Sequence, residues 1–431
     1  SQQSGEWTQV GNDILSNDAN GQKDSSYGYD ADWDYNLNSF PQAVSLSSDG
    51  SRLAIGYPFA GSGVGRARVF ERQLNAWMQV GEDMIGGQGN SSAASWCDDY
   101  MHGGDCSWWY QDYMPFLGSS VSLSADGSRL AVGSIGTRYS TYVNNGYSGY
   151  TEYTTVRLVR VYQEPDSGLG QWSRLGSSLD AAAGGQMTYS RYGYRQFDFG
   201  AAVSLSDDGS TLAISGNKGK YASVHRFDSA QSKWLQVGNN ITLNDNWYDG
   251  PGGMYWYSDP MGPSVALSGD SKRVIIGRDT NNYEGTGAGF VGVYEVDSRT
   301  GNWTRMGDFM QAVAERHNSN FAHSVAISHD GTRIAIGDPR ATSPHADYNG
   351  DNKGATRIYE WNSDLRAWRP AIGTLYGTCS GSTCYSGASV SLSGDGTRLV
   401  IGERGVGYGS NVGKVTIRDL PADLKASEAG D

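Results

Sequence analysis

The chain has 431 residues, 60 of them glycine, and 33 Lys and Arg against 46 Asp and Glu give it a formal net charge of −13. Glycine and proline together stay well below the ~25–30% typical of low-complexity chains, while 13 Trp, 27 Tyr and 10 Phe supply bulk for a packed core. Because nucleic-acid affinity depends mainly on clustered Lys and Arg, this composition excludes DNA and RNA as main partners.

The compartment follows from the termini and the cysteines. No apolar run approaches the ~18–20 residues that span a bilayer, so we expect no transmembrane segment in this chain. The first residues lack the charged and apolar parts of a signal peptide, which leaves a cytosolic protein or one whose signal has been removed.

Four cysteines form two close pairs, Cys97 with Cys106 and Cys379 with Cys384. Their spacings differ from zinc knuckles, so local disulfides are the simplest interpretation. We therefore expect an extracellular protein, secreted or at the cell surface. Three sequons would suit a glycoprotein: Asn90, Asn240 and Asn302.

A short tryptophan motif opens the chain and recurs along it. Each copy has an apolar residue and a Gly three and four residues after the Trp, and the last copy is degenerate. The motif predicts an outer strand whose ring packs between repeats. Its tryptophans are Trp7, Trp77, Trp172, Trp234, Trp303 and Trp368.

A second block follows each tryptophan motif. It alternates apolar and polar residues, passes through Asp-Gly and resumes an apolar run, which predicts a β-hairpin with a tight turn. The six copies begin at Val44, Val121, Val203, Val265, Val325 and Val390. The fourth has Ser271 in place of Gly, so we expect a looser turn there. Five hairpins carry an Arg for which we expect pairing across its own turn, worth little singly: Arg52, Arg129, Arg273, Arg333 and Arg398.

A third strand is expected between each hairpin and the next tryptophan motif. Units of four strands, repeated around an axis, form a β-propeller. We therefore predict an all-β fold, a six-bladed β-propeller of four-stranded blades over residues 1–420, with a polar C-terminal tail at 421–431. The strand at Trp7 would complete the last blade, which lacks a tryptophan strand of its own. The third strands are expected at 68–71, 160–163, 223–227, 291–296, 357–361 and 414–419.

Two short motifs resemble the FG-GAP repeats of integrin-α-like propellers. An FG-x-S-V entry is matched at Phe199, Leu117 and Met261, and the GAP exit is matched at Gly56-Tyr57-Pro58 and Gly337-Asp338-Pro339. The hairpins also resemble TolB-type propeller repeats. The resemblance implies that the first strand is innermost. It does not imply calcium at the hairpins, because their Asp-Gly turns are too short to wrap an ion.

With the first strand innermost, as the resemblance implies, we expect the long insertions to fall almost entirely on one face of this fold, while the other face keeps only tight turns. A rigid scaffold with long loops on one side is typical of binding proteins. The insertions are 17–39, 86–116, 134–154, 181–197, 244–260, 308–320, 341–353 and 376–385.

The insertions are rich in aromatic residues mixed with Asp, Asn, Ser and Gly. Such mixtures suit protein recognition and also sugars, whose rings stack on aromatic faces. The alternative is that these rings pack on each other, although burying all of them would leave phenol hydroxyls unpaired. The candidate ligand-binding residues are Trp33, Trp96, Trp108, Trp109, Tyr110, Tyr113, Tyr189, Tyr192, Tyr194, Trp247, Tyr248, Tyr255 and Trp256.

Two acidic segments resemble calcium loops but lack the Gly and the distal Glu of an EF-hand. The candidate ligands are Asp30, Asp32, Asp34, Asp347, Asn349 and Asp351. Calcium is therefore a candidate cofactor, and a solvated acidic loop is the alternative. The histidines are scattered, and we regard His225 and His329 as incidental. No hydrolase or phosphate-binding motif is present, so the catalytic residues are unknown.

The sequence favours a binding or adhesion protein that recognises a glycan or an extracellular protein through the aromatic-rich face. One alternative is a polysaccharide-active hydrolase or lyase that uses the same face, since a pair of carboxylates could come from different blades. A mainly structural matrix protein is a third interpretation.

Overall fold

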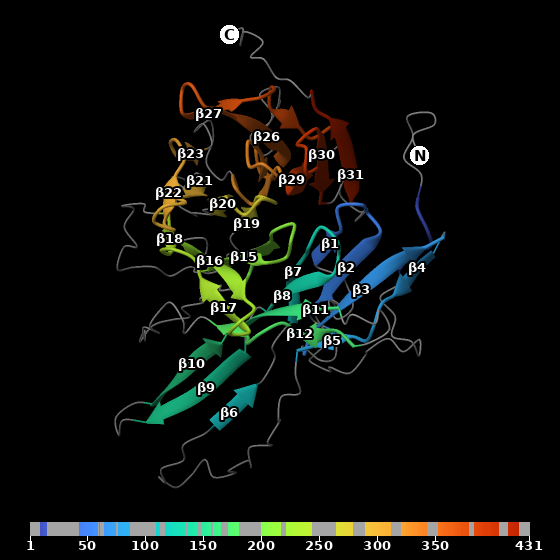
Figure 1. Ribbon diagram of the computed structural model, residues 1–431, viewed down its shortest axis with the longest axis vertical. Helices are drawn as coiled ribbons and strands as arrows, with labels where there is room; N and C mark the ends of the chain where they lie inside the picture. The colour runs from blue at the N-terminus through green and yellow to red at the C-terminus, as the bar shows by residue number, and fades with distance from the viewer. Residues whose placement is uncertain are drawn as a thin grey trace. The chain divides into compact units, whose positions relative to one another are not determined.

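The computed structural model describes residues 9–14, 43–58, 60, 64–74, 76–86, 109–112, 117–134, 137–144, 149–156, 158–164, 171–180, 200–216, 221–243, 264–278, 289–311, 320–342, 352–378, 383–404 and 413–421. Contacts divide the chain into two compact units, Ser1–Gly200 and Ala201–Asp431. The secondary structure of the described residues consists of strands, as Figure 1 shows. Within these ranges, no helix has the length and apolar character needed to cross a membrane.

The first unit contains the sheets of the first two repeats. In both, the strand order along the sheet follows the chain, and a short fifth strand pairs with the third. The first repeat consists of β1 (Ala43–Leu46), β2 (Arg52–Tyr57), β3 (Arg66–Gln73), β4 (Ala76–Gln79) and β5 (Met84–Ile85). The second consists of β7 (Leu117–Leu123), β8 (Arg129–Ser134), β11 (Leu158–Gln163), β12 (Ser173–Arg174) and β13 (Leu179–Asp180).

The second unit contains the sheets of the remaining repeats. The third repeat consists of β14 (Val203–Leu205), β15 (Thr211–Gly216), β16 (Tyr221–Asp228), β17 (Lys233–Gln236) and β18 (Ile241–Thr242). The fourth consists of β19 (Ser264–Leu267), β20 (Arg273–Arg278), β21 (Phe290–Val296), β22 (Trp303–Arg305) and β23 (Met310–Gln311). The fifth consists of β24 (Ser324–Ile327), β25 (Arg333–Asp338), β26 (Asn352–Asn362), β27 (Ala367–Pro370) and β28 (Leu375–Tyr376). The sixth consists of β29 (Thr383–Leu392), β30 (Arg398–Glu403) and β31 (Lys414–Asp419), and a parallel pairing of β26 with β29 joins it to the fifth.

These repeated antiparallel sheets are of the β-propeller type. The expected order of hairpin, third strand and tryptophan strand is confirmed in the first five repeats. In the described part of the chain no sheet closes on itself, so the number of blades and the closure of a ring stay predictions. The Trp7 strand lies outside the described residues.

The tryptophans of the repeat motif pack between neighbouring sheets, as predicted from their periodicity. Trp172, Trp303 and Trp368 are buried. Each donates its indole Nε1–H to a backbone carbonyl in the preceding repeat, at Val80 (3.0 Å), Val237 (3.0 Å) and Met306 (3.1 Å) respectively. Trp77 donates in the same way to Val10 (3.0 Å), which lies three residues after Trp7.

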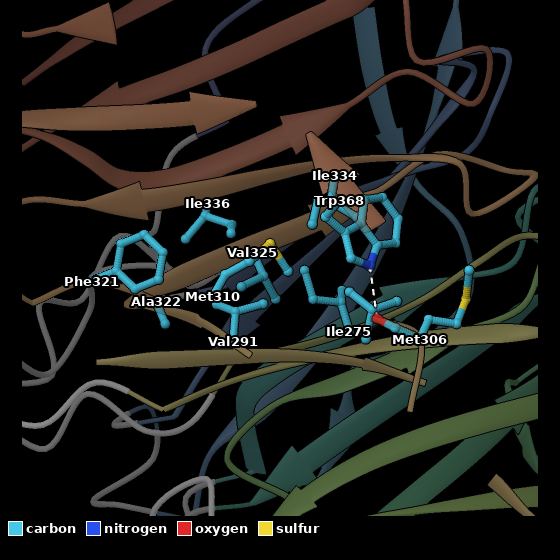
Figure 2. Packing of buried hydrophobic residues seen from close by; sticks show 11 residues of the cluster. Ile275, Val291, Met306, Met310, Phe321, Ala322, Val325, Ile334, Ile336 and Trp368 are labelled. Carbon is cyan, nitrogen blue, oxygen red and sulfur yellow. Dashed lines mark hydrogen bonds between the residues drawn. The ribbon is translucent and has the colours of Figure 1, made fainter. Parts of the chain in front are cut away.

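Apolar side chains from the fourth and fifth repeats form one core cluster in the second unit. Figure 2 shows Trp368 above Met306, beside Ile334, with Phe321 at the other end of the cluster. The cluster comprises Ile275, Val291, Val293, Met306, Met310, Phe321, Ala322, Val325, Ile334, Ile336 and Trp368. Alternate residues of the second and third strands therefore hold adjacent sheets together.

The FG-x-S-V entry and the GAP exit meet between neighbouring repeats. The Ser hydroxyl of one entry donates to the carbonyl of the residue at the Gly position of FG in the next repeat, as Ser324 does to Gly387 (2.9 Å). The exit Gly lies against the same carbonyl, since a Cβ at Gly337 would come within 2.1 Å of Gly387 O. The equivalent serine contacts are Ser120 to Gly200 (2.9 Å) and Ser264 to Ala322 (2.8 Å). These motifs thus set the close approach of adjacent sheets.

The hairpin turns are built differently from the expected two-residue form. Ser47 N donates to Arg52 O (2.9 Å), which leaves four residues in the loop. The Ser47 hydroxyl donates to Asp49 (2.7 Å) and accepts from Arg52 N (2.9 Å). The same Ser–Asp contact recurs in the other five turns, at Ser124, Ser206, Ser268, Ser328 and Ser393.

The prediction of a looser fourth turn is wrong. Ser271 adopts φ 63°, close to the 69° of its counterpart Gly50. Its N–H also donates to Ser268 O (2.9 Å), as Gly50 N–H does to Ser47 O (3.0 Å). The serine and aspartate hydrogen bonds hold this left-handed conformation even without glycine.

Candidate functional sites

Most of the predicted ligand-binding aromatic residues lie outside the described residues. The exceptions are Trp109 and Tyr110, which are both in β6 (Trp109–Asp112). The residues not described are Trp33, Trp96, Trp108, Tyr113, Tyr189, Tyr192, Tyr194, Trp247, Tyr248, Tyr255 and Trp256. Their part in a binding surface stays a prediction.

Two insertions that we expected as loops contribute strands to a separate three-stranded sheet. β9 (Thr137–Asn144) and β10 (Gly149–Val156) form a hairpin, and β6 pairs with β9 on its other side. The register places Tyr110 opposite Ser140, and Ser140 opposite Tyr153. We call β6, β9 and β10 the insertion sheet.

The predicted calcium ligands, Asp30, Asp32, Asp34, Asp347, Asn349 and Asp351, also lie outside the described residues. Within the described ranges, no group of three or more His, Cys, Asp or Glu is placed to hold a metal ion. Calcium binding stays a prediction.

Only one of the four cysteines is described. Cys384 is buried and disulfide-bonded. Cys97, Cys106 and Cys379 lie outside the described residues, so the two pairings stay predictions.

A cavity of about 350 Å³ lies between the first and second repeats, within the first unit. Its lining is mostly polar and includes two acidic and two basic side chains. The lining residues are Glu82, Asp83, Met84, Ile85, Arg160, Tyr162, Gln171, Trp172 and Arg174. The sequence interpretation did not identify this site, because its residues come from two repeats.

The two carboxylates of the cavity have partners. Asp83 is paired with Arg68 (Nε to Oδ1, 2.7 Å) and Arg66 (Nη1 to Oδ2, 3.1 Å). Burial raises the pKa of Asp83, but hydrogen bonds from Arg68 and Gln79 outweigh it and hold the pKa below its ordinary value. Glu82 accepts a hydrogen bond from Gln171 Nε2 (2.7 Å). Asp83 is therefore an ionised carboxylate already matched by two guanidinium groups.

Three of the hairpin arginines reach beyond their own turns, contrary to the prediction. Arg52 pairs with Glu164 and donates to Gly127 O (3.2 Å) in the next turn. Arg273 likewise donates to Asp330 O (3.1 Å). The buried Arg333 donates to Gly396 O (2.8 Å). These arginines therefore link successive repeats. Their partners could not be predicted, because the spacing within one hairpin shows only the residues of that hairpin.

His329, for which the sequence predicts only an incidental place in a hairpin turn, has a specific partner. Its Nδ1 lies 2.5 Å from Asp207 Oδ2, two turns away in the second unit. The pair passes over Gly269, where a Cβ would lie 2.3 Å from that nitrogen. Asp207, Gly269 and His329 each directly follow the Ser of their turn, so they occupy equivalent positions in three successive repeats. An alignment of the repeats would therefore have shown that the three residues lie next to one another. Both side chains are about half exposed, at 50% and 48%.

The enzyme alternative would require a pair of carboxylates that converge on one site. Two buried carboxylates, Asp338 and Glu403, lie at the ends of the second strands of the fifth and sixth repeats. Asp338 is paired with Arg357 (3.0 Å). Glu403 lies 3.9 Å from Lys414 Nζ. Each carboxylate thus has a cation within its own repeat, which is the arrangement of structural ion pairs.

No protein-family model matches the sequence, and no curated protein matches it significantly. Several solved structures are similar in fold. A complex of KlAtg21 with the coiled coil of AgAtg16 matches at 10% identity and a TM-score of 0.45, covering 88% of this chain and 81% of that one. Chaetomium thermophilum Sqt1, bound to the N-terminus of ribosomal protein L10, matches at 12% identity and 0.39, covering 84% and 82%. The β-propeller domain of Myceliophteria thermophila Cps50 (Swd1) matches at 11% identity and 0.36, covering 84% and 92%. At these values the similarities assign no family and transfer no function.

Proposed function

We propose that this protein binds a glycan through the aromatic-rich face that carries its long insertions, which we call the insertion face. The insertion sheet forms part of this binding surface. The observation that carries the proposal is that insertions 86–116 and 134–154 pair into one sheet separate from the propeller-type sheets. Backbone pairing gives such a sheet a fixed register, and rigid elements position binding residues better than free loops do. An extracellular protein ligand is the other outcome that a binding screen would reveal.

The proposal includes the finer features of the fold. The chain would be a six-bladed propeller of FG-GAP type, which the serine-to-carbonyl contacts between entries support. Its N-terminal strand would complete the last blade. Residues 9–14 support this. The carbonyl of Val10 accepts the indole N–H of Trp77, just as the carbonyl of Val80, after the tryptophan strand of the first repeat, accepts the indole N–H of Trp172. The segment after Trp7 thus has the contact of a tryptophan strand that precedes the first repeat. An extracellular location, the two disulfides and calcium at the acidic insertions belong to the same proposal.

Tryptophans of the insertions are expected to contribute stacking surfaces. Replacing Trp108, Trp109, Trp247 or Trp256 with alanine should weaken binding by about 1–3 kcal/mol, as for aromatic anchors of other interfaces. The melting temperature should stay nearly unchanged, because the repeats do not require these rings. The measurement is a titration of each variant with the strongest ligand from a glycan array, run with and without calcium.

Leu235 provides the matched control, since it is an apolar side chain, 41% exposed on β17, outside the insertions. Leu235→Ala should leave binding unchanged. If all four tryptophan variants destabilise the fold and none changes ligand affinity, the rings serve packing and the proposal is wrong.

A further inference from the structure

Three repeats carry an arginine at the same register of the third strand. Arg68 lies opposite Ile55, Arg160 opposite Val132 and Arg357 opposite Ile336. Two of these arginines have a carboxylate partner, because Arg68 pairs with Asp83 (2.7 Å) and Arg357 with Asp338 (3.0 Å). The repeats thus provide an internal reference for what a guanidinium at this register binds.

The second repeat lacks the corresponding carboxylate. Asp83 stands six residues after Trp77, and the residue six after Trp172 is Ser178. The Ser178 hydroxyl accepts a hydrogen bond from Arg174 Nη1 (3.1 Å). Arg160 instead donates Nη1 to the backbone carbonyl of Gly86 (2.8 Å). Its Nε is buried and has no hydrogen-bond partner among the described residues.

A buried donor of a charged group without a partner is destabilising. Arg160 lines the cavity between the first two repeats, together with Arg174. An anion in this cavity would meet the part of the Arg160 side chain that lines it, rather than the buried Nε, and would supply the negative charge that the second repeat lacks at this register.

The local charge also favours an anion, although the chain as a whole is acidic. Arg66 and Arg68 already match Asp83 on the cavity wall. Glu82 is engaged by Gln171. The lining itself carries Arg160 and Arg174 against Glu82 and Asp83, and Asp83 is already neutralised by two arginines from outside the lining. Guanidinium groups bind carboxylates and sulfates through paired hydrogen bonds.

We propose that the cavity binds the anionic group of an acidic sugar, with Arg160 and Arg174 as its cationic partners. The volume of about 350 Å³ exceeds what a bare carboxylate or sulfate needs and leaves room for a sugar ring. Gln171 and Glu82 offer a donor and acceptors for ring hydroxyls. The choice of a sugar rests on the proposed glycan function, whereas the anion site rests on the arginines.

The test is calorimetric titration of the full chain with D-glucuronate and with glucose 6-sulfate. Glucose tests the need for the charge, and N-acetylglutamate tests the need for the sugar. Saturable binding of at least one acidic sugar, with weaker binding of glucose and of N-acetylglutamate, is expected. Comparison of the two acidic sugars distinguishes a uronate from a sulfate ester.

Two variants connect the binding to the cavity. Ser178→Asp places a carboxylate opposite Arg160, as Asp83 lies opposite Arg68, and should weaken acidic-sugar binding by ~10- to 100-fold without lowering the melting temperature. Arg160→Gln should weaken binding by a similar factor. Lys233→Gln, which removes an exposed cation on β17, is the control and should change nothing.

Failure to detect saturable binding of either acidic sugar would overturn the proposal. So would equal binding of glucose or of N-acetylglutamate, or affinities of Ser178→Asp and Arg160→Gln within twofold of the unchanged chain. These outcomes are separable from the proposed insertion-face function. Loss of array binding in the tryptophan variants concerns that face, and loss in Ser178→Asp concerns the cavity.

Discussion

Replacing Trp303 with alanine is expected to lower the free energy of unfolding by about 3–5 kcal/mol. The Trp303 ring is only 5% exposed and packs in a cluster with Leu243 and Val265. Its Nε1–H donates to Val237 O in the preceding repeat (3.0 Å). Alanine would remove this packing and leave the carbonyl without its donor. The measurement is the free energy of unfolding in urea.

Two further variants divide this effect into its parts. Trp303→Phe keeps most of the ring and loses the hydrogen bond, so it should lower stability by about 1 kcal/mol. Leu235→Ala shortens an exposed side chain on an equivalent outer strand and should stay within about 0.5 kcal/mol. A loss for Trp303→Ala no greater than for Leu235→Ala would contradict the packing role of the repeat tryptophans.

Lowering the pH from about 6.5 to about 4 is expected to remove about 3 kcal/mol of stability through His225. This ring is buried, and Nε2 lies 3.0 Å from Ser223 Oγ. Burial lowers the pKa of His225 from 6.5 to about 4, because the charged imidazolium is disfavoured away from water. Between these values the unfolded chain binds a proton that the folded protein does not. Stability from this group is therefore complete above pH 6.5 and decreases as the pH falls towards 4.

The natural replacement for His225 is an aromatic residue. His225 lies opposite Leu212, and the same register carries Phe70 opposite Leu53 and Tyr162 opposite Leu130. His225→Phe should therefore keep the packing and remove this part of the pH dependence. The measurement is the free energy of unfolding in urea at several pH values for both proteins. The contribution of the other histidines cancels in the difference between the two. Parallel stability curves between pH 6.5 and 4 would show that His225 is not the group responsible.

The turn aspartates act in a lower pH range. The N–H of Ser51 and the hydroxyl of Ser47 donate to the Asp49 carboxylate and lower its pKa to about 2. Asp395 has the same value because of Ser393 and Thr397. Their contributions are present above the ordinary carboxyl pKa and are lost as the pH falls towards 2, so they do not obscure the His225 effect above pH 4.

The periodic part of this fold could be predicted from the sequence, because strand order and tryptophan packing repeat with the motifs that encode them. Errors arose where contacts cross between repeats. The partners of Arg52 and Arg333 come from other repeats, which hairpin spacing does not reveal. The prediction for the Ser271 turn is wrong because the turn geometry depends on the Ser268 hydrogen bonds rather than on glycine alone.

The candidate sites were less predictable than the fold. The β9–β10 hairpin has a local signal, since Asn145-Gly146, a typical hairpin turn pair, stands between two segments rich in Tyr and Thr. Its pairing with β6 joins two insertions and has no sequence signal. The cavity does have a sequence signal. Alignment of the tryptophan motifs shows Ser178 at the position where the first repeat has Asp83, so Arg160 lacks the carboxylate that Arg68 has.

The central claim, that the insertion sheet belongs to the binding surface, is tested most directly by shortening the β9–β10 hairpin. Ser134 Oγ already lies 3.0 Å from both Leu158 N and Leu158 O. Residues 135–157 can therefore be replaced by the four-residue connection of the third repeat, residues 217–220. The measurement compares this chain with the unchanged one on a glycan array, beside their melting temperatures. We predict an unchanged melting temperature and loss of the array signal. An unchanged array signal from the shortened, folded chain would contradict the claim.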